Sequence, residues 1–317
     1  MKYELAIFHE NSVFLPCVCA SVTVEQDRKG QPGKMSFSVI KTDGLDFSEG
    51  DACRFCVDGV TVFFGFVFEK SRSGSDNRII KAVCYDQLYY LKNKDWFKYE
   101  NKTASEVIQM LADDFGLNAG TIADTGYKIP SRVEDGKTLF DIIQNALDET
   151  VKNTGKMYVL YDKAGKLTLS DISDMKLGTL VFNDTAGDFE YKTSIAGSTY
   201  NKIRLLKDGA EPVTVRDSEN IKRWGVLQYA EKVSDDNVNL TSMANSLLGL
   251  YNAKSRTLTV KNVLGDVRVR AGTLLPVVMD LGDMKISNYM LVEQAKHTFT
   301  DNSHFMDLKV RGNNFVT

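Results

Sequence analysis

The sequence predicts an α+β protein that is mainly β, in which two similar β-barrel domains flank an insert that contains helices. One observation is a repeat. A Gly turn, a strand, a hairpin, a long strand, a polar loop and a final strand occur in that order at 49–86 and again at 271–312. The other is a change of period, because strand-like alternation gives way to helical spacing of the apolar residues between about residues 95 and 175. We expect domains at 1–95, 96–179 and 180–317.

The first region reads as short strands separated by turn residues. Asp58-Gly59 is the strongest hairpin signal, because a type I′ turn needs positive φ at both central residues. The repeat near the other end has its turn around Asp280–Asp283. The strands expected in the first region are Tyr3–His9, Val18–Glu25, Lys34–Ile40, Ala52–Val57, Val60–Glu69 and Ile79–Tyr85.

Two helices are expected in the middle region. Thr103 and Glu106 form a capping box that begins the first helix, which extends to Phe115. Thr138 begins the second helix in the same way, and Gly155 stops it. The insert should close with a hairpin of strands Met157–Tyr161 and Lys166–Ser170.

Strand patterns return after about residue 180, with one helix that Asn239 caps. Its apolar residues recur at helical spacing up to Tyr251. The expected strands are Tyr200–Lys207, Val213–Arg216, Val226–Lys232, Arg256–Val260, Thr273–Met279, Tyr289–Phe299 and Phe305–Arg311.

Composition excludes several classes of protein. Apolar residues make up 43% and charged residues 26%, which is an ordinary globular balance. The net charge of -3 argues against a general nucleic-acid binder. The most hydrophobic run, Val60–Phe68, is far shorter than the roughly 20 apolar residues of a membrane helix. We expect a soluble chain made in the cytoplasm, with no membrane anchor and no sequence-specific nucleic-acid partner.

A metal site would have to use the cysteines or histidines. Cys53 and Cys56 have zinc-knuckle spacing, but at strand period their side chains point to opposite faces. His9, His297 and His304 have no ligand spacing. We therefore predict no metal and no cofactor, and reduced thiols that are buried or half-buried.

Catalytic candidates are equally weak. The carboxylate pairs Asp113-Asp114 and Asp148-Glu149 lie on expected helices, where solvated faces explain them. His297 and His304 bracket a polar loop near Asp301 and Asp307, which leaves an acid–base or metal role open there. No nucleophile elbow or phosphate-binding Gly loop occurs. We predict no catalytic residue and no enzyme, with a carboxylate-based peptidoglycan hydrolase as the alternative.

Aromatic residues cluster in two places. Phe63, Phe64, Phe66 and Phe68 occupy both faces of one strand, which is either buried on both faces or presents one face to another subunit. A second group could stack on sugar, as in a carbohydrate-binding protein, or pack between the first domain and the insert, which we favour. This group is Tyr85, Tyr89, Tyr90, Trp96, Phe97 and Tyr99.

The order of several short motifs resembles the hub proteins of phage baseplates, of the late-control-protein-D type found in contractile tails and phage-tail-like bacteriocins. The resemblance covers nearly the whole chain. Its motifs are Phe47–Asp51, Phe64–Val67, Cys84–Leu88, Lys102–Glu106, Gly126–Pro130, Lys137–Asp141, Gly272–Pro276, Val292-Glu293, His297 and Met306–Leu308.

This resemblance implies a structural role in a virion or tail-like particle. It implies a homotrimer in which each chain carries two tube-like β-barrel domains, giving a ring with pseudo-sixfold symmetry that joins the hexameric tail tube to the trimeric spike. The implied partners are the tail tube protein, the spike protein and other baseplate proteins, with assembly in the bacterial host cytoplasm. A carbohydrate-binding tail-tip protein is the related alternative.

Overall fold

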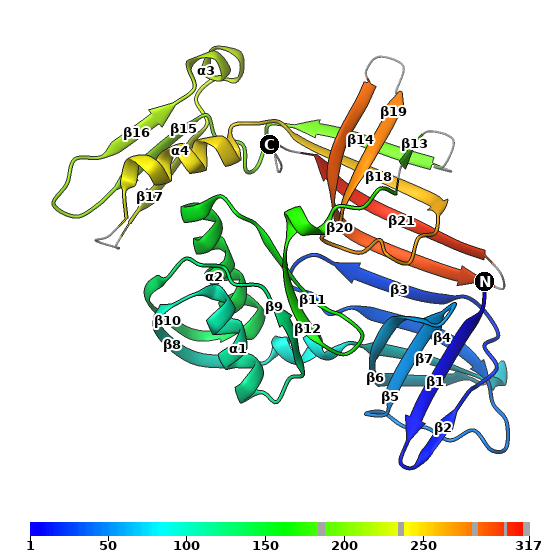
Figure 1. Cartoon of the computed structure of the whole chain (residues 1–317). Coiled ribbons are helices and arrows are strands. Elements are labelled where there is room, and N and C mark those ends of the chain that lie inside the picture. The colour runs from blue at the N-terminus through cyan, green and yellow to red at the C-terminus, as the bar shows by residue number, and fades with distance from the viewer. Residues whose placement is uncertain (180, 183–187, 234–237, 281–284, 301–302, 313–317) are drawn as a thin grey trace.

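The structure, a computed structural model, describes residues 1–179, 181–182, 188–233, 238–280, 285–300 and 303–312. Two β units lie beside each other along one sheet. An insert with helices α1 and α2 packs against both, and a smaller subdomain with α3 and α4 extends from one end (Figure 1). The fold class predicted from the sequence, mainly β within α+β, is confirmed.

The first β unit contains seven strands in the hydrogen-bonded order β3-β4-β7-β6-β5-β1-β2. In the β5–β6 hairpin, Asp58 and Gly59 take φ values of 47° and 81°, as the predicted turn requires. Alternate residues point into one core, for example Met35, Phe37 and Val39 of β4. The strands are β1 Tyr3–His9, β2 Ser12–Phe14, β3 Val22–Asp27, β4 Lys34–Ile40, β5 Ala52–Val57, β6 Val60–Ser73 and β7 Asp76–Tyr85.

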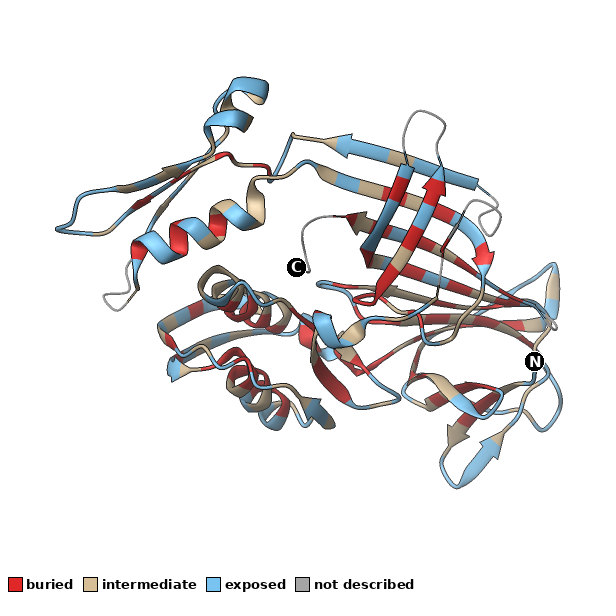
Figure 2. Cartoon of the chain, turned by 45° about the horizontal axis from the view of Figure 1, so that its top comes forward, coloured by how far each residue is buried: buried red, intermediate tan, exposed pale blue. Residues whose placement is uncertain are grey.

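The second β unit repeats this pairing order. Its path β14-β18-β21-β20-β19 matches β3-β4-β7-β6-β5 strand for strand, and every pairing in both paths is antiparallel. Buried residues line this shared sheet (Figure 2). The predicted turn around Asp280–Asp283 lies mostly outside the described residues. The strands are β13 Val181–Phe182, β14 Asp188–Ser194, β18 Ser255–Leu264, β19 Leu274–Asp280, β20 Lys285–Thr300 and β21 Ser303–Gly312.

The insert has its own hydrophobic core, and its two helices pack against that core. Thr103 caps α1 with the full predicted capping box, and Thr138 caps α2. Gly155, at φ 72°, ends α2 in the left-handed conformation. The ribbon of β8 and β10 was not predicted. The elements are η1 Gln87–Lys92, β8 Lys94–Lys102, α1 Ala104–Asp114, β9 Ala119–Ile122, β10 Ile129–Thr138, α2 Leu139–Thr154, β11 Tyr158–Asp162, β12 Leu167–Asp171 and η2 Ile172–Met175.

A subdomain, Tyr200–Tyr251, lies in the chain between β14 and β18. Its sheet has the order β16-β15-β17, and helix α4 covers one face of it with Met243, Ala244 and Leu247. Asn239 caps α4 as predicted. The elements are β15 Lys202–Leu206, β16 Val213–Arg216, α3 Ser218–Trp224, β17 Gln228–Lys232 and α4 Leu240–Tyr251.

Candidate functional site

Strand β20 belongs to both β units and forms the joint between them. Its first half pairs with β19, and its second half pairs with β3 of the first unit, from Gln294 opposite Asp27 to Phe299 opposite Val22. On the outer face, Lys296 forms an ion pair with Glu25 at 3.4 Å. The two units therefore continue one sheet through backbone hydrogen bonds, which fixes their relative orientation.

A charged cluster supports this joint. Both guanidinium groups of Arg28 and Arg311 bind Glu293, with Arg28 Nε donating to Oε2 at 2.7 Å and Arg311 Nε donating to Oε1 at 2.6 Å. Burial raises the pKa of the Glu293 carboxyl, but the two arginines outweigh it and leave that pKa below its usual range. One carboxylate thus links the loop after β3 to β20 and β21.

A second polar cluster joins the insert to both units. The guanidinium carbon of Arg270, before β19, lies 3.7 Å from the ring centroid of Tyr161, and Arg270 Nη2 donates to the carbonyl oxygen of Asp162 at 3.0 Å. Gln87 Nε2 donates to the Asp162 carboxylate at 2.7 Å. Burial raises the pKa values of Asp162 and of Asp86, which caps η1.

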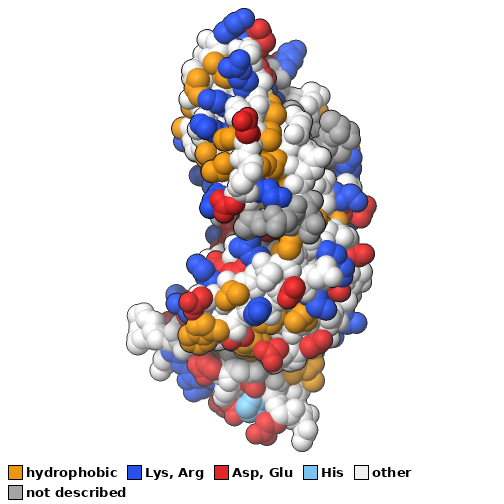
Figure 3. Space-filling model, turned by 90° about the vertical axis from the view of Figure 1, so that its left-hand side faces the viewer, with side chains coloured by type: hydrophobic (Ala, Val, Ile, Leu, Met, Phe, Trp, Pro, Cys, Tyr) orange, Lys and Arg blue, Asp and Glu red, His pale blue; other side chains and the backbone are white. Residues whose placement is uncertain are grey.

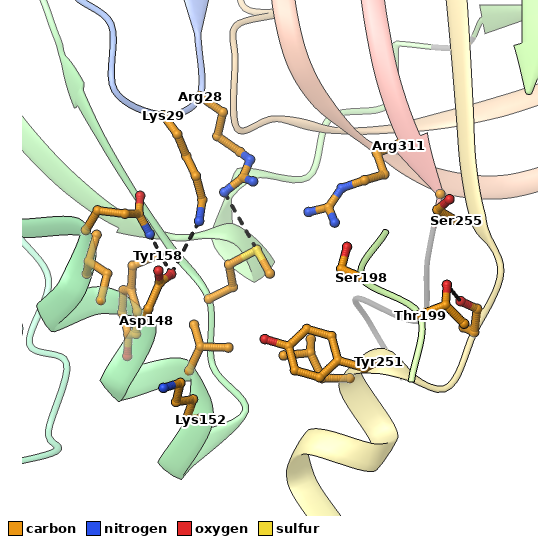
Figure 4. A pocket seen from close by; sticks show the side chains of 17 residues that line it. Arg28, Lys29, Asp148, Lys152, Tyr158, Ser198, Thr199, Tyr251, Ser255 and Arg311 are labelled. Carbon is orange, nitrogen blue, oxygen red and sulfur yellow. Dashed lines mark hydrogen bonds and ion pairs between the residues drawn. The ribbon is translucent and has the colours of Figure 1, made fainter. Parts of the chain in front are cut away.

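A cavity of about 310 Å³ lies where these parts meet (Figure 4). Arg28 and Lys29 enter it from the first unit, and Lys152 lines it from α2. Tyr251, at the end of α4, lines the opposite wall. Asp148 binds Lys29 at 3.3 Å across the rim. The Lys and Arg side chains that line the cavity are paired with nearby carboxylates. We therefore interpret the cavity as a gap between packed parts of the fold.

The sequence singled out His297 and His304, and the structure brings them together. Nδ1 of His297 and Nε2 of His304 share a hydrogen bond of 2.9 Å inside the sheet, and Phe299 stacks on His304 with ring centroids 4.2 Å apart. Burial lowers the pKa of His297 to about 3 and that of His304 to about 4, so both are neutral at pH 7. Asp301 lies outside the described residues.

The acid–base or metal role that the sequence left open at this loop has no support from Asp307. Its Oδ1 accepts a hydrogen bond from the backbone N–H of Asn262 at 3.0 Å. Gly265 packs so closely that a Cβ there would lie 2.0 Å from the His304 ring. The histidine pair is therefore a packed core element rather than an open acid–base site.

The cysteines do not gather either. Cys53 lies in the core beside Cys84, where burial raises its pKa well above the usual range, whereas Cys56 Sγ lies 3.5 Å from Thr61 Oγ1. Cys17 is exposed and outside any strand, contrary to the expectation that all the thiols are buried or half-buried. Within the described ranges, no three His, Cys, Asp or Glu side chains are placed to hold a metal ion.

The helical carboxylate pairs are solvated or ion-paired. Asp113 and Asp114 are exposed at the end of α1, and Gln109 Nε2 donates to Asp113 at 2.8 Å. Glu149 Oε1 accepts from Arg132 at 3.3 Å and from Lys152 at 3.4 Å. Neither pair faces a cavity as two converging carboxylates, the arrangement that glycoside hydrolysis needs.

The second aromatic group divides three ways. Tyr85 and Tyr89 pack with Phe68 on the outer face of β6 and β7, with ring centroids of Tyr89 and Phe68 4.2 Å apart. Phe97 and Tyr99 join the core of the insert. Trp96 stands alone, 76% exposed. The six residues therefore form no single sugar-stacking platform. The favoured packing between the first unit and the insert is not seen for Phe97 and Tyr99, which lie in the core of the insert, or for the exposed Trp96.

Strand β14 and the end of β6 each have an edge without a partner strand among the described residues. Strand β14 pairs only with β18, and most of its residues are exposed. The end of β6, from Glu69 to Ser73, pairs only with β7 because β5 stops opposite Phe66. Such edges are templates for pairing with another chain. In the part of the chain that is described, no helix is long and apolar enough to cross a membrane.

Comparison with known proteins identifies relatives over nearly the whole chain. Residues 22–311 match the family described as YQBQ-like. The chain is 32% identical to the uncharacterized protein YqbQ of Bacillus subtilis, over 99% of this chain and 98% of that protein. It is 30% identical to the phage-like element PBSX protein XkdQ of the same organism, over 95% of this chain and 94% of that one.

Solved structures share the fold at low identity. A tail protein from Neisseria meningitidis superposes with a TM-score of 0.71 at 13% identity, covering 99% of this chain and 98% of that one. The Escherichia coli c3393 protein, a type VI secretion component described as similar to T4 tail proteins gp27 and gp5, gives 0.59 at 9% identity, covering 98% and 78%. The resemblance to phage tail and baseplate proteins seen in the sequence is confirmed.

Proposed function

Because this chain belongs to the YQBQ-like family, we propose that it is the structural hub of a phage tail or phage-tail-like particle. Three copies form a ring of six similar β units, which joins a hexameric tail tube to a trimeric spike. The hub has no catalytic role and assembles with other tail proteins in the host cytoplasm. The division at 1–95, 96–179 and 180–317 describes its parts, with Tyr200–Tyr251 as an addition inside the last.

One observation supports the proposed ring. The second unit already binds the first unit of the same chain through β20 and β3. In the repeat, β6 corresponds to β20 and β14 corresponds to β3, and among the described residues β14 and the end of β6 each have an edge with no partner strand. If the same contact forms between copies, β6 of one chain pairs with β14 of the next. Every unit then contacts its neighbours alike, and the ring has no exposed edge at these strands.

The repeat also predicts the register in which β6 of one copy pairs with β14 of the next. Val67 of β6 corresponds to Val292 of β20, since each exchanges hydrogen bonds with the turn that precedes the repeat. Ser71 then corresponds to Lys296. Lys192 of β14 corresponds to Glu25 of β3. Because Lys296 lies opposite Glu25 within the chain, Ser71 of one copy should lie opposite Lys192 of the next.

Paired cysteines test this register. In a background with Cys17→Ser, which removes an exposed thiol, Ser71→Cys and Lys192→Cys should form a disulfide between copies under mild oxidation. Directly opposite residues of antiparallel strands have Cα atoms about 4.5–5.5 Å apart, within the range that a disulfide spans. Denaturing gels without reductant should show dimers and closed trimers, and the trimer should be the largest product.

The control pairs Ser71→Cys with Thr193→Cys. Thr193 is one residue further along β14, so its side chain points to the opposite face and should not cross-link. Equal cross-linking of the two pairs, or a native mass of a monomer at every concentration, would refute the ring. An isologous dimer in which neither cysteine pair forms a cross-link would show a different assembly.

A further inference from the structure

The subdomain presents a sheet face that no other element of the described residues covers. Helix α4 packs on one face of the β16-β15-β17 sheet, where Ile203 and Leu205 are buried. The opposite face carries the alternate residues of all three strands, and nearly all are exposed. These residues are Lys202, Arg204, Leu206, Thr214, Arg216, Gln228, Ala230 and Lys232.

This face is basic, although the whole chain has a net charge of -3. Among its described strand residues it has four cations and no carboxylate. Lys232 binds Asp208, a loop residue, at 2.9 Å. No ion pair is present for Lys202, Arg204 or Arg216 within the described part of the chain. In Figure 3, Lys and Arg side chains gather over the upper lobe, which is this subdomain.

The arrangement costs stability within the chain. Lys202 lies directly opposite Arg216 in the antiparallel pair, and Arg204 follows on the same face two residues later. Like charges opposite each other on a sheet destabilise it. A local rule broken without compensation inside the chain is typical of a surface that serves a partner.

We propose that this basic face docks an acidic surface of another protein in the assembled particle. Arginine guanidinium groups bind carboxylates through two parallel hydrogen bonds, and arginine is enriched at protein interfaces. Single-stranded nucleic acid is usually held by stacking on aromatic side chains as well as by cations. The face has no aromatic residue, since Tyr229 points to the α4 side. The chemistry therefore favours protein carboxylates.

The inference rests on the proposed function, so the test uses assembled particles. A photo-reactive benzoylphenylalanine replaces Thr214, which lies opposite Arg204 at the centre of the face. After irradiation of purified particles, mass spectrometry should identify a cross-linked peptide from another tail protein with a clear excess of Asp and Glu. The same probe in place of exposed Glu219, on α3, serves as the positional control.

Charge reversal makes the test quantitative. Arg204→Glu with Arg216→Glu should lower the Thr214 cross-link about tenfold or more, because repulsion replaces attraction at the face. Lys163→Glu with Lys166→Glu makes the same charge change at exposed positions of the β11–β12 turn and should leave the yield unchanged. Far-ultraviolet circular dichroism confirms that each variant folds.

The outcomes separate the two proposals. Absence of the chain from purified particles would refute the hub. If the chain is present, three results overturn the docking surface alone. These are no cross-link from the probe at Thr214, a cross-link to nucleic acid, or a cross-linked peptide without an excess of acidic residues. Equal loss in both charge-reversal variants would also overturn it, because the effect would then be one of net charge.

Discussion

The backbone N–H of Gly272 donates to the carbonyl oxygen of Val292 at 2.8 Å, and 222 positions earlier Gly50 makes the same bond to Val67 at 2.8 Å. Both glycines have positive φ, 96° and 95°. Each long strand is irregular just after its valine, where its register against the next strand shifts by one residue. Two distant segments thus share one turn and one bulge, which is the strongest physical evidence for a repeated unit.

Replacement of these glycines by alanine should separate strain from packing. Gly50→Ala meets open space, so only the backbone strain remains, about 1–2 kcal/mol. Gly272→Ala has the same strain, and its Cβ would also lie 2.8 Å from Val159, which adds about 1–3 kcal/mol. Denaturant unfolding of both variants should rank Gly272→Ala as the more damaging. Equal losses would contradict the packing role of Val159.

The histidine pair should make stability depend on pH. The folded pKa values of His297 and His304 lie below 6.5, so the unfolded chain binds more protons. Their contribution is complete above about pH 6.5 and is lost as the pH falls through 4 toward 3, at about 1.4 kcal/mol per pH unit for each histidine. The raised pKa values of Asp86 and Asp162 act in the opposite direction.

A comparison of variants isolates the histidines from the carboxylates. His297→Gln removes one titrating group, and the free energy of unfolding of this variant should fall less steeply between pH 6.5 and 4.5 than that of the parent chain. An identical slope in His297→Gln and in the parent chain would show that the pair does not titrate in this range.

Arg270 should hold the insert to the second β unit through shape as well as charge. Arg270→Met removes the stacking on Tyr161 and the hydrogen bond to Asp162, and leaves the nearby carboxyls without a cation. We expect a loss of about 2–3 kcal/mol. Arg270→Lys keeps the charge but lacks the planar guanidinium group, so it should lose less stability than Arg270→Met but remain less stable than the parent chain. A lysine variant as stable as the parent chain would mean that charge alone matters.

Lys202 offers a stabilising change. Lys202→Glu places a carboxylate opposite Arg216 in place of a like charge, which should raise the stability of the subdomain by about 0.5–1 kcal/mol. Thermal unfolding at low salt should show the gain, and 0.5 M NaCl should reduce it. Lys222→Glu on α3, beside Glu219, is the control and should be neutral or destabilising. A loss of stability in Lys202→Glu would contradict the like-charge argument.

Local signals made most elements predictable. The capping residues Thr103, Thr138 and Asn239 begin α1, α2 and α4 as expected, and the turn at Asp58-Gly59 has the expected geometry. These signals act within a few residues along the chain. The β8–β10 ribbon was missed because its strands pair across residues 94–138 with helix α1 between them, and neither strand has a clean alternating pattern of apolar residues.

The site was less predictable. The proximity of His297 and His304 follows from the hairpin, but the contact of Arg28 with Glu293 joins residues 265 positions apart. The basic face of the subdomain was missed as well. Its cations lie on three separate strands, where they alternate with residues of the opposite face, and only the pairing of the strands brings Lys202 opposite Arg216.

By itself, the sequence determined the fold class, the repeat and the identity of most helices and strands, because turns, caps and periodicity are local properties. Only the tertiary structure decided that β20 continues into β3, which leaves β14 and the end of β6 as the matching free edges. Strand partners are chosen by burial and by backbone pairing between distant segments. No local pattern in the chain encodes that choice, and the proposed ring depends on it.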